Sequence, residues 1–319
     1  MLPPMPKTKA RPKADLAVRV GSLELPNPVM VASGTFGALM DTVLDVDRIG
    51  AVVEKTVTML PRRGNPHPRV WETAGGMLNA IGLDNYGLEG WIKKRWPQIK
   101  GYRCKLVISV SGRTEEEFAA LVRRIDELPR VDAFELNISC PNVSHGMDFG
   151  CDPAACARVV RACRKATKRP IFAKMTPNIA DVTVPARAAM EAGADGLSLI
   201  NTLKGMAVDW RRRAPCLGNV TGGLSGPAIK PVALGMVWQT ARALPKAPII
   251  GIGGIMNADD ALEFIVAGAS AVQLGTANFV DANSATRVVD ELPGKLAEAG
   301  VGRVRDLIGT MKAAAPEDP

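Results

Sequence analysis

Eight short apolar runs alternate along the chain with segments whose apolar residues recur at helical spacing. The runs cover residues 28–34, 51–57, 105–112, 133–139, 171–176, 196–201, 248–254 and 271–276. Their apolar positions are continuous rather than alternating, which indicates strands of a parallel sheet covered on both faces. Eight strands separated by helices favour a (β/α)₈ TIM barrel over an open doubly wound sheet.

The helical segments carry recognisable start signals. The clearest helix follows Thr114, which forms a capping box with Glu117, and apolar residues recur behind it at 118, 121, 122 and 125. Further helices are predicted over 152–166, 181–192, 229–244, 257–267 and 283–298. A β-hairpin is predicted over 16–25, before the first strand.

Two connections, 58–104 and 202–228, are much longer than is usual between a strand and a helix. Both follow the C-terminal end of a strand, where barrel active sites are built, so we expect them to wall or cover the site. One barrel domain is predicted over 16–310, with a disordered basic leader over 1–15 and a flexible tail over 311–319.

Composition narrows the class of protein. The 319 residues are 47% hydrophobic with a net charge of +8, part of which belongs to the proline-broken leader. Aromatic residues make up only 4%, which argues against a stacking surface for nucleic acids. The sequence has neither a membrane-spanning run nor the apolar middle of a signal peptide, so we expect a cytoplasmic protein.

Cysteine and histidine usage excludes several chemistries. The six cysteines form no C-x-x-C pair, so zinc, iron–sulfur and dithiol sites within this chain are poorly supported and no metal is predicted. Cys156 and Cys163 are interpreted as core residues. Only His67 and His145 are available for a Ser-His-Asp triad, which disfavours a hydrolase.

Polar residues cluster where the predicted strands end. The last two strands end in the glycine-rich turns "GIGGI" and "LGTANF", whose backbone N–H groups could hold a phosphate, although tight turns without a ligand also explain them. "GIGGIM" does not match the G-x-G-x-x-G dinucleotide fingerprint. The polar strand ends are Ser33, Lys55, Ser109, Ser111, Asn137, Ser139, Cys140, Lys174, Asn201 and Thr202.

Two lysines and one cysteine at these ends are candidates for chemistry. Lys55 or Lys174 could stabilise the anionic reduced ring of a flavin, form a Schiff base, or make a structural ion pair. Cys140 could be a nucleophile, a general base or an inert core residue. Its position at a strand end, held by Pro141 and beside Asn142, favours a functional role.

Asparagines recur at the strand ends and in the first long loop. The four are Asn79, Asn137, Asn142 and Asn201. Each amide offers both donors and an acceptor, so together they could hold a heterocycle with N–H and C=O edges.

Seven motifs, in order, resemble the catalytic chain of the class 1B dihydroorotate dehydrogenases. They are "VMVASGTFG", "GNPHPRVWETAGGMLNAIGLDNYGLE", "ELNISCPNV", "INTLKGM", "GGLSGPAIKPVAL", "PIIGIGGI" and "AGASAVQLGTANF", and the resemblance covers about 16–310. It implies an FMN-binding barrel that oxidises (S)-dihydroorotate to orotate in pyrimidine (UMP) biosynthesis.

The resemblance also implies roles for individual residues. Cys140 matches the base that removes a proton from C5 of dihydroorotate while a hydride leaves C6 for FMN. Substrate positions are matched by Lys55, Asn79, Gly82, Leu83, Asn137, Asn142, Asn201 and Thr202. FMN positions are matched by Ser33, Lys55, Thr56, Asn137, Lys174, Ile200, Gly226, Gly253, Gly254, Gly275 and Thr276.

Members of this class pass electrons to NAD through a separate subunit that carries FAD and a [2Fe-2S] cluster. The resemblance therefore implies such a partner, in a heterotetramer of two chains of each kind. This chain has neither cluster-type cysteine spacing nor a dinucleotide fingerprint, which fits a subunit that depends on that partner.

Three features depart from the family pattern, and two alternatives stay open. Ser109 stands where relatives commonly have Asn, "SHGM" with His145 replaces a Lys-x-Gly-Gly type loop, and Arg211 to Arg213 form an unusually basic loop. The alternatives are an FMN subunit of the dihydropyrimidine dehydrogenase type and a non-redox phosphate-binding TIM barrel. A class 2 enzyme is disfavoured because it would use a serine base and an apolar N-terminal helix.

Overall fold

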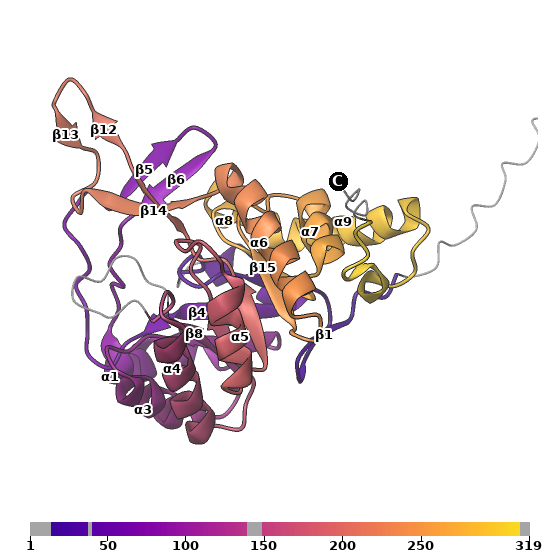
Figure 1. Cartoon of the computed structure of the whole chain (residues 1–319), viewed down its shortest axis with the longest axis horizontal. Coiled ribbons are helices and arrows are strands. Elements are labelled where there is room, and N and C mark those ends of the chain that lie inside the picture. The colour runs from indigo at the N-terminus through magenta and orange to yellow at the C-terminus, as the bar shows by residue number, and fades with distance from the viewer. Residues whose placement is uncertain (1–13, 38–39, 139–148, 313–319) are drawn as a thin grey trace, which may run out of the picture.

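A closed, eight-stranded parallel barrel forms the centre of the computed structural model (Figure 1), which describes residues 14–37, 40–138 and 149–312. The barrel strands are β3 (Val29–Val31), β4 (Ala51–Val57), β7 (Lys105–Val110), β8 (Ala133–Asn137), β9 (Ile171–Lys174), β10 (Gly196–Leu199), β15 (Ile249–Ile252) and β16 (Ala271–Leu274). They pair in chain order, and β16 closes the sheet on β3. Each lies within one of the eight predicted runs, so the predicted TIM barrel is confirmed.

In the described part of the chain, six helices of nine residues or more surround the barrel, each within a predicted helical segment. They are α3 (Glu115–Asp126), α4 (Pro153–Ala166), α5 (Thr183–Glu191), α6 (Lys230–Ala243), α7 (Ala258–Ala267) and α9 (Ser284–Glu298). The Thr114 hydroxyl caps α3 by accepting from the Glu117 N–H at 3.2 Å. The Glu117 carboxylate accepts from the backbone of Arg113, one residue before the expected partner. Side chains of Asp152 and Asn257 cap α4 and α7.

The other short elements complete the ring. Two 3₁₀ turns, η1 (Met40–Thr42) and η2 (Val46–Arg48), follow β3 where other strands are followed by a full helix. The predicted hairpin is present as β1 (Val18–Val20) and β2 (Leu23–Leu25), and its apolar side chains are buried. Its turn at Gly21 lies against the backbone of Asp195, just before β10, which places the hairpin at the N-terminal end of the barrel. The last elements along the chain are α8 (Ala277–Val280) and η4 (Val304–Leu307).

The two long connections fold together into a second sheet. Its antiparallel strands, in the order β11-β14-β6-β5, are β11 (Leu203–Met206), β14 (Thr221–Ser225), β6 (Gly76–Asn79) and β5 (Val70–Thr73). The first connection also holds α1 (Gly87–Lys94) and α2 (Trp96–Ile99), and the second ends in η3 (Pro227–Ile229). These loops thus form one wall, as expected, but their pairing was not predicted from the sequence.

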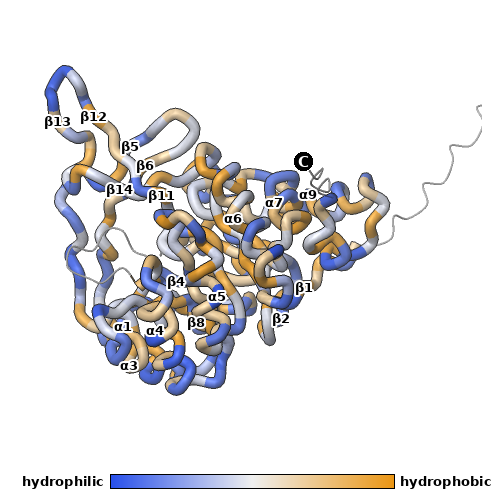
Figure 2. The backbone as a smooth tube through the Cα atoms, in the orientation of Figure 1, coloured by the Kyte–Doolittle hydropathy of each residue, from blue (hydrophilic) through white to orange (hydrophobic). Residues whose placement is uncertain are grey.

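A small hairpin projects from this wall. It consists of β12 (Val208–Asp209) and β13 (Ala214–Pro215), and Figure 1 shows it extending away from the barrel. The basic run 211–213 lies in its turn, where Figure 2 shows hydrophilic residues, and all three arginines are exposed. The guanidinium of Arg211 stacks on Trp210 at 4.5 Å, so this run is a solvated tip of the wall.

The predicted leader and tail fall mostly outside the described residues, which exclude 1–13 and 313–319. Asp15 donates its backbone N–H to Gly302 and accepts from Val304, so the chain just before β1 is joined to the segment after α9. In the described ranges, no helix has both the length and the apolar character needed to cross a membrane.

One buried ion pair connects the barrel to the first long connection. The guanidinium of Arg95, between α1 and α2, donates to both carboxylate oxygens of Glu54 on β4, at 3.2 and 3.3 Å. Burial raises the pKa of Glu54, and the charge of Arg95 opposes that shift. Removing either partner would therefore leave the other buried without its counter-charge.

We expect Arg95→Met to destabilise the fold by about 3–5 kcal/mol at pH 7, because it leaves the Glu54 carboxylate buried and unpaired. Loss of Arg95 raises the pKa of Glu54 further. An acid whose pKa is raised on folding favours the folded state at low pH and loses that contribution as the pH rises. The deficit should therefore shrink as the pH falls toward the ordinary carboxyl pKa of about 4.3.

Urea unfolding at pH 7 and pH 5 measures both effects. Arg124→Met, which breaks the exposed pair with Glu127, is the matched control and should change stability by less than about 0.5 kcal/mol. An Arg95→Met deficit that is equally large at both pH values would contradict this interpretation.

Candidate active site

A cavity lies at the C-terminal ends of the barrel strands, under the four-stranded wall. Among the described residues that the resemblance assigns to substrate or FMN, all but Lys174 line it, and of the other polar strand ends Ser109 and Ser111 do not line it. The lining ones are Ser33, Lys55, Thr56, Asn79, Gly82, Leu83, Asn137, Ile200, Asn201, Thr202, Gly226, Gly253, Gly254, Gly275 and Thr276. The predicted base Cys140 and its neighbour Asn142 lie outside the described residues, as do Ser139 and His145.

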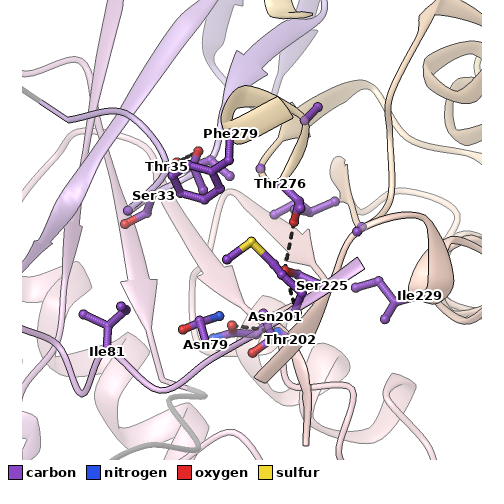
Figure 3. A pocket seen from close by; sticks show the side chains of 18 of the residues that line it. Ser33, Thr35, Asn79, Ile81, Asn201, Thr202, Ser225, Ile229, Thr276 and Phe279 are labelled. Atoms are coloured by element: carbon purple, nitrogen blue, oxygen red, sulfur yellow. Dashed lines mark hydrogen bonds between the residues drawn. The ribbon is translucent and has the colours of Figure 1, made fainter. Parts of the chain in front are cut away.

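Amide side chains gather at one end of the cavity, which we call the amide end (Figure 3). Asn137 ends β8, and its Oδ1 accepts from Asn201 Nδ2 at 3.4 Å. Asn201 Oδ1 in turn accepts from the backbone of Thr202 at 2.8 Å. Asn79, at the end of β6, donates to the Gly223 carbonyl at 3.3 Å. Three of the four predicted asparagines are thus brought together from the barrel and the wall.

A chain of hydroxyl groups orients this end from behind. Ser33 Oγ donates its only hydrogen to the Glu54 carbonyl at 3.0 Å. In the 3.3 Å contact between Ser33 Oγ and Thr56 Oγ1, Thr56 is therefore the donor. Thr56 then accepts from Ser109 Oγ at 2.9 Å and from Asn137 Nδ2 at 3.2 Å. These bonds fix the Asn137 amide with its oxygen toward Asn201. The departure at Ser109 therefore acts behind the cavity wall, through Thr56.

Glycines form another part of the cavity lining, which we call the glycine end. Gly226, Gly253 and Gly254 have φ values of +97°, +135° and +74°, which favour glycine. A Cβ on Gly226 would lie 2.8 Å from the Cα of Gly76, and one on Gly254 would lie 2.8 Å from the Gly226 carbonyl oxygen. Close packing of these turns therefore requires glycine, and all three glycines line the cavity, where backbone N–H groups could hold a phosphate.

Hydroxyl and apolar side chains complete the lining. Thr276 Oγ1 and Ser225 Oγ are 2.8 Å apart at the glycine end (Figure 3). Apolar side chains lie along the cavity: Ile200, Ile229, Ile252, Met256 and Phe279. The glycine turns suit the phosphate of FMN, and the apolar surface suits its ring system. The amide end suits a small heterocyclic substrate beside that ring, so the lining fits FMN together with a substrate.

Several lining residues were not predicted from the sequence. They include Thr35, Val70, Met77, Ile81, Ser225, Ile229, Met256 and Phe279. All but Met256 lie inside the seven quoted motifs, but no role was assigned to them. Most belong to the wall or to short turns, whose positions depend on pairing between distant segments, and Phe279 lies on α8.

The two candidate lysines occupy different environments. Lys55 lines the cavity next to Gly34, where an added Cβ would lie 3.4 Å from its Nζ. Lys174 is buried inside the barrel, and its Nζ lies 3.3 Å from Glu135 Oε1. For Lys174 the ion-pair interpretation is confirmed, and its proposed contact with FMN stays a prediction.

Two core cysteines are unsuited to base chemistry. Burial raises the pKa of both Cys156 and Cys163 to about 12. Their thiols stay protonated near neutral pH, in agreement with their interpretation as core residues.

The comparisons with known proteins agree on one family. The model of the family described as dihydroorotate dehydrogenase matches residues 15–296. A relative from Pelobacter propionicus, named dihydroorotate dehydrogenase B (NAD(+)), catalytic subunit, is 53% identical over 94% of this chain and 99% of its own length. Relatives with the same name from Trichlorobacter lovleyi and Geobacter sulfurreducens are 52% and 50% identical over the same shares.

We expect Gly254→Ala to destabilise the chain by about 1–3 kcal/mol, because the new Cβ meets both the Gly226 carbonyl and Lys230 at a positive φ. It should also weaken FMN binding, measured by quenching of FMN fluorescence on titration with the protein. Gly235→Ala, in α6, is the matched control. Its Cβ meets nothing within 4 Å, so it should stabilise by about 0.5–1 kcal/mol and leave binding unchanged. Equal FMN affinity in both variants would contradict a ligand at the glycine end.

Proposed function

The chain belongs to the dihydroorotate dehydrogenase family, and from that membership we propose that it is the catalytic subunit of a B-type enzyme of pyrimidine biosynthesis. It is an oxidoreductase that would oxidise (S)-dihydroorotate to orotate. The observation that carries this proposal is the single cavity at the strand ends, which joins a glycine end to an amide end. The identity of 50–53% to B-type catalytic subunits favours this function over the dihydropyrimidine dehydrogenase and non-redox alternatives.

FMN would occupy the glycine end and the apolar part of the cavity. Gly253, Gly254, Gly275 and Thr276 would hold its phosphate by their backbone N–H groups, since β15 and β16 are neighbouring strands that end side by side. Ile200 and the other apolar side chains would exclude water from its ring. FMN, when bound, supplies the acceptor for the hydride that leaves C6 of dihydroorotate.

The amide end would bind the substrate. Amide groups of Asn79, Asn137 and Asn201 can donate to and accept from the ring edges of dihydroorotate, and Lys55 can pair with its carboxylate. The orientation of Asn137 is set in advance by Thr56, so little ordering is left for the moment of binding.

The proposed base is close to the amide end along the chain. Cys140 follows Asn137 by three residues, so the two Cα atoms can be at most about 11 Å apart. Its thiolate would remove the C5 proton while the amide end holds the ring in place.

Electrons would leave through a second subunit. The relatives are named dihydroorotate dehydrogenase B (NAD(+)), catalytic subunit, which supports a partner subunit that mediates transfer to NAD. In the proposed assembly that partner carries FAD and a [2Fe-2S] cluster, and two chains of each kind form a heterotetramer.

We expect Cys140→Ser to retain FMN but to slow its reduction by dihydroorotate about 10²–10⁴-fold, because a hydroxyl is a much weaker base than a thiolate. Anaerobic stopped-flow absorbance measures this half-reaction. Since a free thiol titrates near pH 8.5, the wild-type rate should rise with pH up to about that value. Cys151→Ser, outside the cavity lining, is the control and should keep the wild-type rate. An unchanged rate in Cys140→Ser would exclude Cys140 as the base.

A second test addresses the partner. The purified chain with FMN should oxidise dihydroorotate with an artificial dye as acceptor, but reduce NAD only after the proposed FAD and iron–sulfur subunit is added. Rapid NAD reduction by the chain alone would contradict this division of labour, and a colourless protein after FMN addition would exclude the flavoenzyme.

A further inference from the structure

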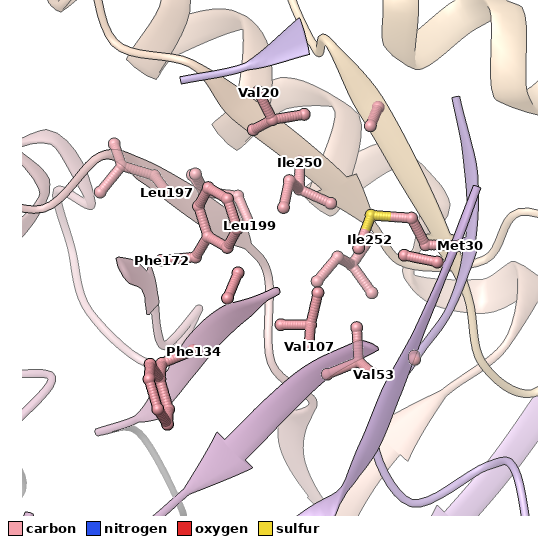
Figure 4. Close-up of a cluster of buried hydrophobic side chains, with 14 of the residues drawn as sticks. Val20, Met30, Val53, Val107, Phe134, Phe172, Leu197, Leu199, Ile250 and Ile252 are labelled. Atoms are coloured by element: carbon pink, nitrogen blue, oxygen red, sulfur yellow. The ribbon is translucent and has the colours of Figure 1, made fainter. Parts of the chain in front are cut away.

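Three long polar side chains lie inside the barrel beneath the cavity. Glu135, Lys174 and Gln273 are 0%, 7% and 1% exposed. Glu135 is two residues before Asn137, and Gln273 two residues before Gly275, so each faces the same interior as a cavity-lining residue. Around them the interior is apolar, as the side chains of Val53, Val107, Ile250 and others show (Figure 4).

These three side chains form one connected set. Lys174 Nζ lies 3.3 Å from Glu135 Oε1, and Gln273 Nε2 donates to Glu135 Oε2 at 2.8 Å. Strand β16, which carries Gln273, is separated from β8 by three intervening strands, β3, β4 and β7. The hydrogen bond therefore spans the barrel interior, and it holds the Glu135 carboxylate near the barrel axis.

The register gives the ion pair a direction. Lys174 is the Cα partner of Asn137, whereas Glu135 is the partner of Phe172, one layer farther from the cavity. The Lys174 backbone thus belongs to the layer next to the cavity, and its side chain reaches the Glu135 carboxylate. Glu135 uses one of the three N–H donors of Lys174.

Burying these polar and charged groups costs free energy of folding. A charged pair with 0% and 9% side-chain exposure loses hydration that its mutual attraction only partly returns. Two further polar atoms in this interior, Gln273 Oε1 and Ser198 Oγ, are buried without a hydrogen-bond partner among the described residues. Ser198 is the Cα partner of Lys174 on β10. A purely structural core would place apolar side chains at these positions.

We propose that Glu135 is a positioning residue for Lys174: its carboxylate fixes the ammonium below the cavity, and Gln273 fixes the carboxylate from across the barrel. This role rests on the proposed function, since a fixed positive charge there favours the negative charge that FMN gains on reduction. Without the carboxylate, a buried lysine tends to lose its proton. Glu135→Gln should therefore remove the same charge as Lys174→Met.

The test is the reduction midpoint potential of FMN bound to Glu135→Gln, Lys174→Met and the double variant, with FMN affinity measured alongside. Both single variants should lower the potential by similar shifts, and the double variant should add nothing to Lys174→Met. Glu135→Asp, which keeps the charge, should recover most of the wild-type potential. Glu54→Gln is the matched control: it alters a buried, ion-paired carboxylate on the outside of β4, so it should reduce thermal stability and leave the potential unchanged.

The outcomes separate this role from a structural one and from the proposed function. An unchanged or raised potential in Glu135→Gln, or additive shifts in the double variant, would overturn the positioning role. If Glu135→Gln did not fold, comparing Lys174→Met with the double variant would still decide, because different potentials would show that Glu135 acts without Lys174. Failure of the wild-type chain to bind FMN, or to be reduced by dihydroorotate, would instead refute the proposed function.

Discussion

Closure of the barrel, through hydrogen bonds from β16 to β3, is the constraint on which the candidate site depends. The pairing of Gln273 with Met30 and of Leu274 with Val31 joins the two ends of the sheet. Because of it, polar residues from the first and last strands face one cavity although more than two hundred residues separate them. Closure also brings Gln273 within 2.8 Å of Glu135 across the barrel interior. An open sheet of the same strands would lose both arrangements.

Different parts of the cavity lining suit different parts of the proposed chemistry. Glycine turns at the ends of β15 and β16 line the cavity with backbone, which suits a phosphate. The amide end is oriented by hydroxyl groups of Thr56 and Ser109 that are themselves buried on barrel strands. The polar set beneath the cavity adds a charge held from two sides of the barrel. Side chains that are fixed before a ligand arrives cost little ordering entropy on binding, which is how a rigid scaffold supports catalysis.

Much of this architecture could be predicted from the sequence because it depends on local patterns. Strand runs, helix periodicity and caps are local, and strand ends in a barrel must converge, so Lys55, Asn137 and Asn201 could be predicted to share one site. The four-stranded wall could not be predicted, because its short strands have no strong strand pattern of their own. They form by pairing between distant segments, as Asn79 on β6 does with Gly223 on β14. Glu135 and Gln273 did carry a signal, as polar residues inside apolar runs. Their partners, however, depend on the barrel register. The role of Cys140 remains a prediction from the family resemblance.

The central claim is that this cavity holds FMN and dihydroorotate together. Anaerobic titration of the FMN-loaded chain with dihydroorotate tests it most directly, because no acceptor or partner subunit is involved. The yellow colour of bound FMN should disappear in proportion to the dihydroorotate added, with one equivalent reducing one FMN. Bound FMN that keeps its colour in excess dihydroorotate would contradict the account.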